Sequence, residues 1–192
     1  MPNIALAKQI AANNNKAGVK ELVNALRHKS KDIQFDCIKT LYELGELKPE
    51  LVAGYAKEFI AMLDSKHNRL QWGAMCALSC ITTKNPAELY NELGKIAAVA
   101  EKGTVITKDH YAKILTRLGG MKQYADDCFT LLIELLHSAP VNQLPTYAEN
   151  AMPLVNDKNR AIFIEVLTLR LRDLAEQPTK YKRMEKVIKK LK

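Results

Sequence analysis

A stretch of nine residues occurs twice in this chain. It reads Leu26-Arg27-His28-Lys29-Ser30-Lys31-Asp32-Ile33-Gln34, and 37 residues later it reads Leu63-Asp64-Ser65-Lys66-His67-Asn68-Arg69-Leu70-Gln71. The same spacing relates Ile38 to Met75, Leu41 to Leu78, Leu44 to Ile81 and Pro49 to Pro86. A fixed period of this size is typical of stacked helical repeats. We therefore predict an all-α chain built from helix pairs.

Working outward with this period, we expect an N-terminal helix at 3–13 followed by five helix pairs. The first helices of the pairs are predicted at 18–28, 49–64, 86–101, 122–138 and 159–175, and the second at 32–46, 68–83, 105–118, 143–155 and 179–191. Polar residues that could accept first-turn amide hydrogens mark four helix starts: Asp32, Asn68, Asn85 and Thr179. Glycines mark three predicted helix ends: Gly45, Gly103 and the Gly119-Gly120 pair.

The composition agrees with helix-on-helix packing. Hydrophobic residues make up 47% of the 192 residues but aromatics only 6%, which favours an aliphatic core. The continuous period predicts a single domain over 1–192. The start of the chain does not read as a secretory leader, and no apolar stretch approaches the length of a membrane span, so we expect a cytoplasmic protein. The four cysteines lie inside helical patterns and are expected to be packed thiols.

The net charge of +8 is concentrated at the C-terminus. Residues 179–192 carry seven basic groups and one acid, so the preceding 178 residues carry only +2. An apolar stripe runs opposite the lysines of this segment: Tyr181, Met184, Val187, Ile188 and Leu191. We expect 179–192 to be a basic helix that caps the array. A binding arm for an acidic partner, a membrane surface or nucleic acid is the alternative.

The repeated pattern Leu-x6-Ile/Leu-Gln-x2-Cys/Ala-Ile/Met-x2-Leu resembles the HEAT repeat. The resemblance is strong over 18–83, recognisable over 86–118 and loose beyond. It implies a right-handed α-α superhelix and a role in binding protein or nucleic acid. Two departures are notable: the period is shorter than the usual ~40–47 residues, and Gln34 and Gln71 stand where HEAT units often carry arginine.

No constellation in the sequence predicts catalysis. Asp126 and Asp127 are adjacent, which points their carboxylates about 100° apart on a helix and makes a poor acid/base pair. HEAT-like DNA glycosylases use tryptophans and a catalytic aspartate, whereas here Trp72 is followed one turn later by Cys76. We expect neither enzymatic activity nor a cofactor.

Two binding surfaces are predicted. The second helices of HEAT pairs line the inner surface, which gives a candidate protein-binding surface: Gln34, Lys39, Tyr42, Trp72, Met75, Ser79, Lys113 and Arg117. Cations beside helix starts and in the tail give a candidate phosphate-binding set: Lys29, Lys31, Lys66, Arg69, Lys186, Lys189 and Lys190. The first set predicts a non-enzymatic scaffold for another protein, and the second predicts the alternative, a nucleic-acid-binding protein. The identity of the partner and the oligomeric state are left open.

Overall fold

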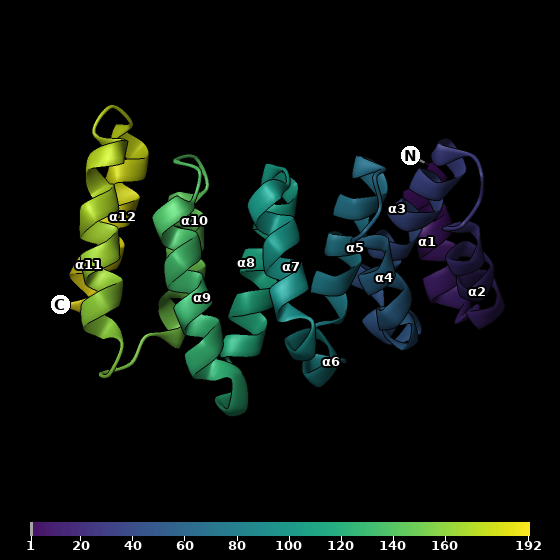
Figure 1. Ribbon diagram of the computed structural model, residues 1–192, viewed down its shortest axis with the longest axis horizontal. Helices are drawn as coiled ribbons and strands as arrows, with labels where there is room; N and C mark the ends of the chain where they lie inside the picture. The colour runs from purple at the N-terminus through teal and green to yellow at the C-terminus, as the bar shows by residue number, and fades with distance from the viewer. Residues whose placement is uncertain (1) are drawn as a thin grey trace. The chain divides into compact units, whose positions relative to one another are not determined.

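The computed structural model describes residues 2–192, and all regular elements in that range are helices (Figure 1). The chain divides into two compact units, one ending at Ile114 and one beginning at Leu115. The all-α fold class is therefore confirmed. We describe each unit by itself, and the single domain over 1–192 stays a prediction.

The first unit contains α1 to α7 and the first part of α8. The bounds are α1 (Pro2–Asn13), α2 (Lys16–Ala25), α3 (Lys31–Leu47), α4 (Ala56–Met62), α5 (Asn68–Ile81), α6 (Pro86–Asn91), α7 (Leu93–Lys102) and α8 (Val105–Gly119), with 3-10 turns η1 (Pro49–Leu51) and η2 (Ala53–Tyr55) before α4. In the second unit lie η3 (Lys122–Tyr124), α9 (Ala125–Ser138), α10 (Leu144–Ala151), η4 (Met152–Leu154), α11 (Arg160–Leu171), η5 (Arg172–Leu174) and α12 (Pro178–Leu191).

The helices that follow Pro49 and Pro86 differ from the prediction because they are interrupted. The segment predicted at 49–64 begins with two 3-10 turns before α4, and the one at 86–101 breaks at Glu92 into α6 and α7. Gly54 and Gly94 lie in these segments, and the space around a Cβ atom at either is open. Low helix propensity of glycine, without a packing contact to offset it, fits these breaks.

Several predicted helix boundaries are wrong in detail. Ser30, not Asp32, is the N-cap of α3, and its hydroxyl accepts from the Ile33 amide. Asn68 is the first residue of α5 after the N-cap His67, and Thr179 lies inside α12 because Pro178 takes the first position. Asn85 does occupy the N-cap position of α6, although its side chain does not accept an amide hydrogen there.

Helices α3 and α5 pack closely through glycines. A Cβ atom on Gly73 would lie 2.8 Å from two side-chain carbons of Ile38, and one on Gly45 would lie 2.9 Å from Cβ of Cys80. Gly45, a predicted helix end, instead lies buried inside α3, where its missing side chain makes room for α5. The repeat-related Leu41 and Leu78 are both fully buried in this core, as their shared phase predicts.

We expect Gly73→Ala to destabilise the protein by about 1–3 kcal/mol, because the new methyl group meets a β-branched side chain that cannot easily move. Gly94→Ala is the matched control, since Gly94 is also helical but has open space around it. The control should stabilise the protein by about 0.5–1 kcal/mol. Urea unfolding of both variants tests this, and equal effects of the two changes would contradict the close packing of α3 on α5.

Polar side chains link successive helix pairs within the first unit. Gln34 donates from Nε2 to the His28 carbonyl at 2.8 Å, and its Oε1 lies 3.2 Å from Nδ1 of His67. Gln71 makes a similar local contact by donating to the Leu63 carbonyl at 2.8 Å. Each glutamine therefore binds the loop that precedes its own helix. Gln34 also connects the loop before α3 to the loop before α5 through His67.

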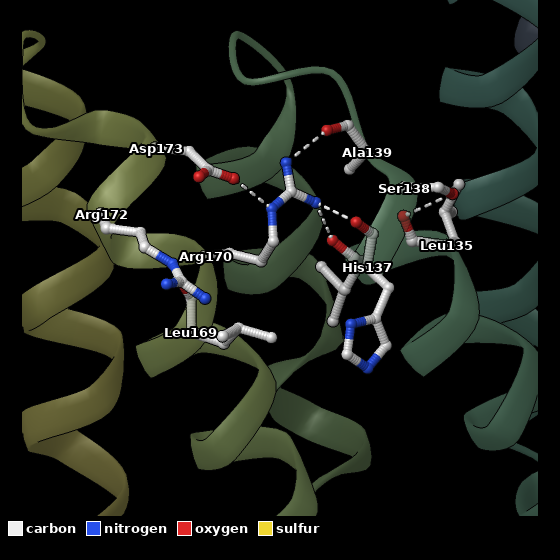
Figure 2. A network of polar contacts seen from close by, with 9 residues as sticks. Leu135, His137, Ser138, Ala139, Leu169, Arg170, Arg172 and Asp173 are labelled. Atoms are coloured by element: carbon white, nitrogen blue, oxygen red, sulfur yellow. Dashed lines mark hydrogen bonds and ion pairs between the residues drawn. The ribbon is translucent and has the colours of Figure 1, made fainter.

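In the second unit, Arg170 binds the C-terminal end of α9 (Figure 2). Its guanidinium donates to the carbonyls of Leu136, His137 and Ala139 and to the carboxylate of Asp173, which lies 2.6 Å from Nε. The last carbonyls of a helix have no partner within the helix, so this side chain satisfies them and holds α11 against α9. The Arg170 side chain is only 12% exposed, which limits screening by solvent.

Arg170→Lys should lower the free energy of unfolding by about 1–3 kcal/mol, because an ammonium group cannot reproduce the planar fork that reaches three carbonyls and a carboxylate. Arg172→Lys is the control, since exposed Arg172 donates from Nε to the Leu169 carbonyl alone. It should change the stability by less than about 0.5 kcal/mol. Thermal melts of both variants test this prediction. An Arg170→Lys variant that melts at the wild-type temperature would contradict a stabilising role for the contacts between Arg170 and the end of α9.

The basic C-terminal segment forms α12 and packs on α10 and α11. Its buried residues are Met184, Val187 and Ile188, whereas Tyr181 and Leu191 of the predicted stripe are half-buried. Arg183 pairs with Glu149 of α10 at 2.6 Å, and this ion pair lowers the pKa of the Glu149 carboxyl below its usual value. The apolar face of the tail thus completes the core of the second unit.

Candidate functional site

An aromatic-cation cluster lies on the facing surfaces of α3 and α5. We define it by Phe35, Lys39 and Tyr42 of α3 and by Arg69 and Trp72 of α5. Trp72 is in edge contact with Phe35, their ring centroids being 5.8 Å apart, and its centroid lies 6.0 Å from that of Tyr42. Arg69 is exposed and the other four are half-buried. The cluster therefore presents aromatic rings and cations to solvent together.

The repeat explains why the aromatic rings meet. Phe35 and Trp72 are 37 residues apart and occupy the same position of α3 and α5. Because the two helices pack closely across Gly73, equivalent side chains are brought side by side. Aromatic edge contacts of this kind contribute about 0.5–1.5 kcal/mol beyond the area they bury.

Two cations lie over the Phe35 ring. The guanidinium carbon of Arg69 is 5.0 Å from the ring centroid, and Nζ of Lys39 is 5.9 Å from it. Contacts of this kind contribute about 0.5–1 kcal/mol each at exposed sites. They fix both cationic groups beside the aromatic surface instead of leaving them to sample solvent.

A shallow cavity of about 190 Å³ opens on the other side of Trp72. Its lining residues come from the starts of α5 and α8 and from the loop before α8: Asn68, Gln71, Trp72, Lys102, Gly103, Thr104 and Thr107. Ligand pockets for drug-sized molecules measure about 300–1,000 Å³, so this cavity has room for a single side chain or a small group. Val105 and Ile106, in the first turn of α8, are 42% and 40% exposed beside it.

The predicted protein-binding residues fall into three groups. Lys39, Tyr42 and Trp72 belong to the cluster, while Gln34 closes a loop. The prediction is wrong for Met75 and Ser79, which are fully buried and cannot line an accessible surface. The Ser79 hydroxyl donates to the Cys76 carbonyl and lies 2.7 Å from Nδ1 of His110, so it belongs to the packing between helices.

The remaining predicted residues are distributed over both units. Lys113 is exposed on α8, and its charge acts on the nearby Cys76 thiol, whereas Arg117 belongs to the second unit. The phosphate-binding candidates of the first unit, Lys29, Lys31, Lys66 and Arg69, include Arg69 of the aromatic cluster. The exposed lysines of α12, Lys189 and Lys190, lie with Lys186 in the second unit.

Phe35 and the cavity beside Trp72 are not among the predicted features. The sequence could have identified Phe35 as a neighbour of Trp72, because the two residues are 37 positions apart and are therefore equivalent in the repeat alignment. The cavity gives no such signal, because it depends on how the loop at Gly103 meets the start of α5.

The thiols and the tyrosine near the site have raised pKa values. Burial raises the pKa of Cys76 to about 12 and that of Tyr42 to about 12, and it raises the pKa of Cys128 in the second unit to about 11. A thiol is nucleophilic only as a thiolate, so these groups are protonated and unreactive near neutral pH. Over residues 2–192, moreover, the structure brings no three His, Cys, Asp or Glu side chains together as a metal site.

None of the helices described over residues 2–192 is long and apolar enough to cross a membrane. No protein-family model and no curated protein matches the chain. The chain is similar in fold to an engineered protein whose crystal structure was determined by the Northeast Structural Genomics Consortium. The TM-score is 0.67 at 17% sequence identity, over 96% of this chain and 85% of the engineered one. This similarity concerns the fold alone.

We expect all four cysteine thiols to react very slowly with Ellman's reagent at pH 8 in the native protein, because all four are buried. For Cys37, Cys76 and Cys128 a raised pKa also keeps the thiolate fraction low. After unfolding in guanidinium chloride, all four should react at the rate of free cysteine. Fast labelling of Cys76 in the native state would show that the surface between α3 and α5 is open to its thiol.

Proposed function

We propose that this protein is a non-enzymatic interaction module that binds another protein through the surface around Trp72. The observation that carries the proposal is the aromatic-cation cluster, which presents Trp72, Tyr42 and Arg69 beside a small cavity. Tryptophan, tyrosine and arginine are the residues that most often dominate binding energy at protein interfaces. A rigid pair of helices holds them, so little order has to be gained on binding.

We further propose that the helix pairs are HEAT-like repeats. In the first unit, side-chain hydrogen bonds between successive pairs join residues separated by 31 to 38 positions, close to the sequence period. One of these links is made by Gln34, whose Oε1 lies 3.2 Å from Nδ1 of His67, at a position where HEAT units often have arginine. The right-handed superhelix that the resemblance implies stays a prediction.

Photo-cross-linking tests the binding surface. A benzophenone amino acid placed at Val105, beside the cavity, should form a discrete adduct with a polypeptide in lysate of the source cells. The same group at Lys57, an exposed position of α4 away from the cluster, is the control. Adducts at Val105 that disappear with Arg69→Glu support the proposal, while equal labelling at both positions would contradict it.

Nucleic-acid binding is the second candidate function. Lys29, Lys31 and Lys66 extend the positive charge of Arg69 along the loops before α3 and α5, and the lysines of α12 form a second basic surface. An adduct at Val105 that is removed by nuclease, together with affinity that falls steeply as salt is raised, would favour this candidate.

A further inference from the structure

We propose that the partner of the Trp72 surface is a short acidic peptide segment with one apolar anchor side chain, which enters the cavity between α5 and α8 while its carboxylates pair with Arg69 and Lys102. This inference rests on the proposed function and names the chemistry of the partner. Three observations carry it: the size of the cavity, the charge around it and the apolar residues beside it.

The cavity sets the size of the anchor. At about 190 Å³ it is too small for a typical cofactor or drug-sized ligand but has room for one side chain. Among the lining residues that the structure describes, Trp72 supplies the one apolar wall, and Asn68, Gln71, Thr104 and Thr107 supply polar groups to the rest of the lining. An anchor with an apolar body is the occupant that buries the exposed part of the Trp72 ring.

Cations lie on both sides of Trp72. Arg69 lies on one side of Trp72, over the Phe35 ring, and Lys102 lines the cavity on the other side. A carboxylate on either side of the anchor would find a cation within the same surface.

The apolar and acidic neighbours favour a peptide over a polyphosphate chain. Val105 and Ile106 are exposed beside the cavity, and aliphatic side chains offer contact area to a peptide but no stacking surface to a base. Glu43 and Glu46 of α3 lie close enough to Cys76 to raise its pKa, so the charge of this part of the first unit is mixed. Interfaces with nucleic acid are far more uniformly positive.

A library of short random peptides displayed on phage identifies the ligand chemistry even though the natural partner is unidentified. Selection on the full chain should enrich sequences in which one aromatic or aliphatic residue is flanked by Asp or Glu. The same selection on the Arg69→Glu variant should lose the acidic residues. Arg69 is exposed, so this change leaves the core intact.

The consensus peptide, made synthetically with a fluorescein label, then gives the affinity by anisotropy. Arg69→Glu and Trp72→Ala should each weaken binding by about tenfold or more, and Trp72→Phe should restore most of it. Lys57→Glu carries the same charge change on α4 and should alter the affinity by less than about twofold. Because Trp72 is the only tryptophan of the chain, its fluorescence reports occupation of this site in the wild-type protein.

Selected peptides without acidic enrichment would overturn the inferred partner while leaving the proposed function in place, provided that their binding still requires Trp72. Peptides that bind equally well to Trp72→Ala would overturn both. A labelled oligothymidylate, tested in parallel, examines single-stranded nucleic acid as the alternative occupant. If the oligonucleotide binds through Arg69 and Trp72 and no peptide does, the inference is wrong.

Discussion

The close contact between α3 and α5 is the constraint on which the first unit depends. Gly73 leaves just enough space for Ile38, and Gly45 leaves it for Cys80, so the two helices meet with little side-chain material between their backbones. This approach places Leu41 and Leu78 in one core and brings Phe35 and Trp72 into contact on the accessible side. The close packing of α3 on α5 therefore accounts both for the buried leucine core and for the aromatic contact on the accessible side.

Polar contacts add specificity to this packing. Gln34 and Gln71 satisfy loop carbonyls that would otherwise face a helix start, and Gln34 also reaches the next loop through His67. In the second unit the charged side chain of Arg170 has a similar role, because its guanidinium donates hydrogen bonds to the last carbonyls of α9. In both units a long side chain binds backbone carbonyls of an earlier segment, which makes neighbouring elements depend on one another.

Much of the fold could be predicted from the sequence, because the period of 37 residues indicates both the order of the helices and which of their positions face the core. The predicted helices correspond to the observed ones within a few residues, apart from the breaks near Gly54 and Gly94. The role of Gly45 could not be predicted, since a glycine that ends a helix and one that permits close packing look alike in a sequence. Exposure is equally difficult to predict: Ser79 lies on the same helix as Trp72, yet it is fully buried, and its hydroxyl lies 2.7 Å from Nδ1 of His110 on α8.

The most direct test of this account is the nuclear Overhauser effect between the Trp72 indole and its neighbours. With one tryptophan in the chain, its Nε1–H resonance needs no lengthy assignment. The account predicts cross-peaks from the indole ring to the aromatic protons of both Phe35 and Tyr42, which lie on α3 at centroid distances of 5.8 and 6.0 Å. An indole ring without cross-peaks to either side chain would contradict the register of α3 on α5, and with it the surface proposed for binding.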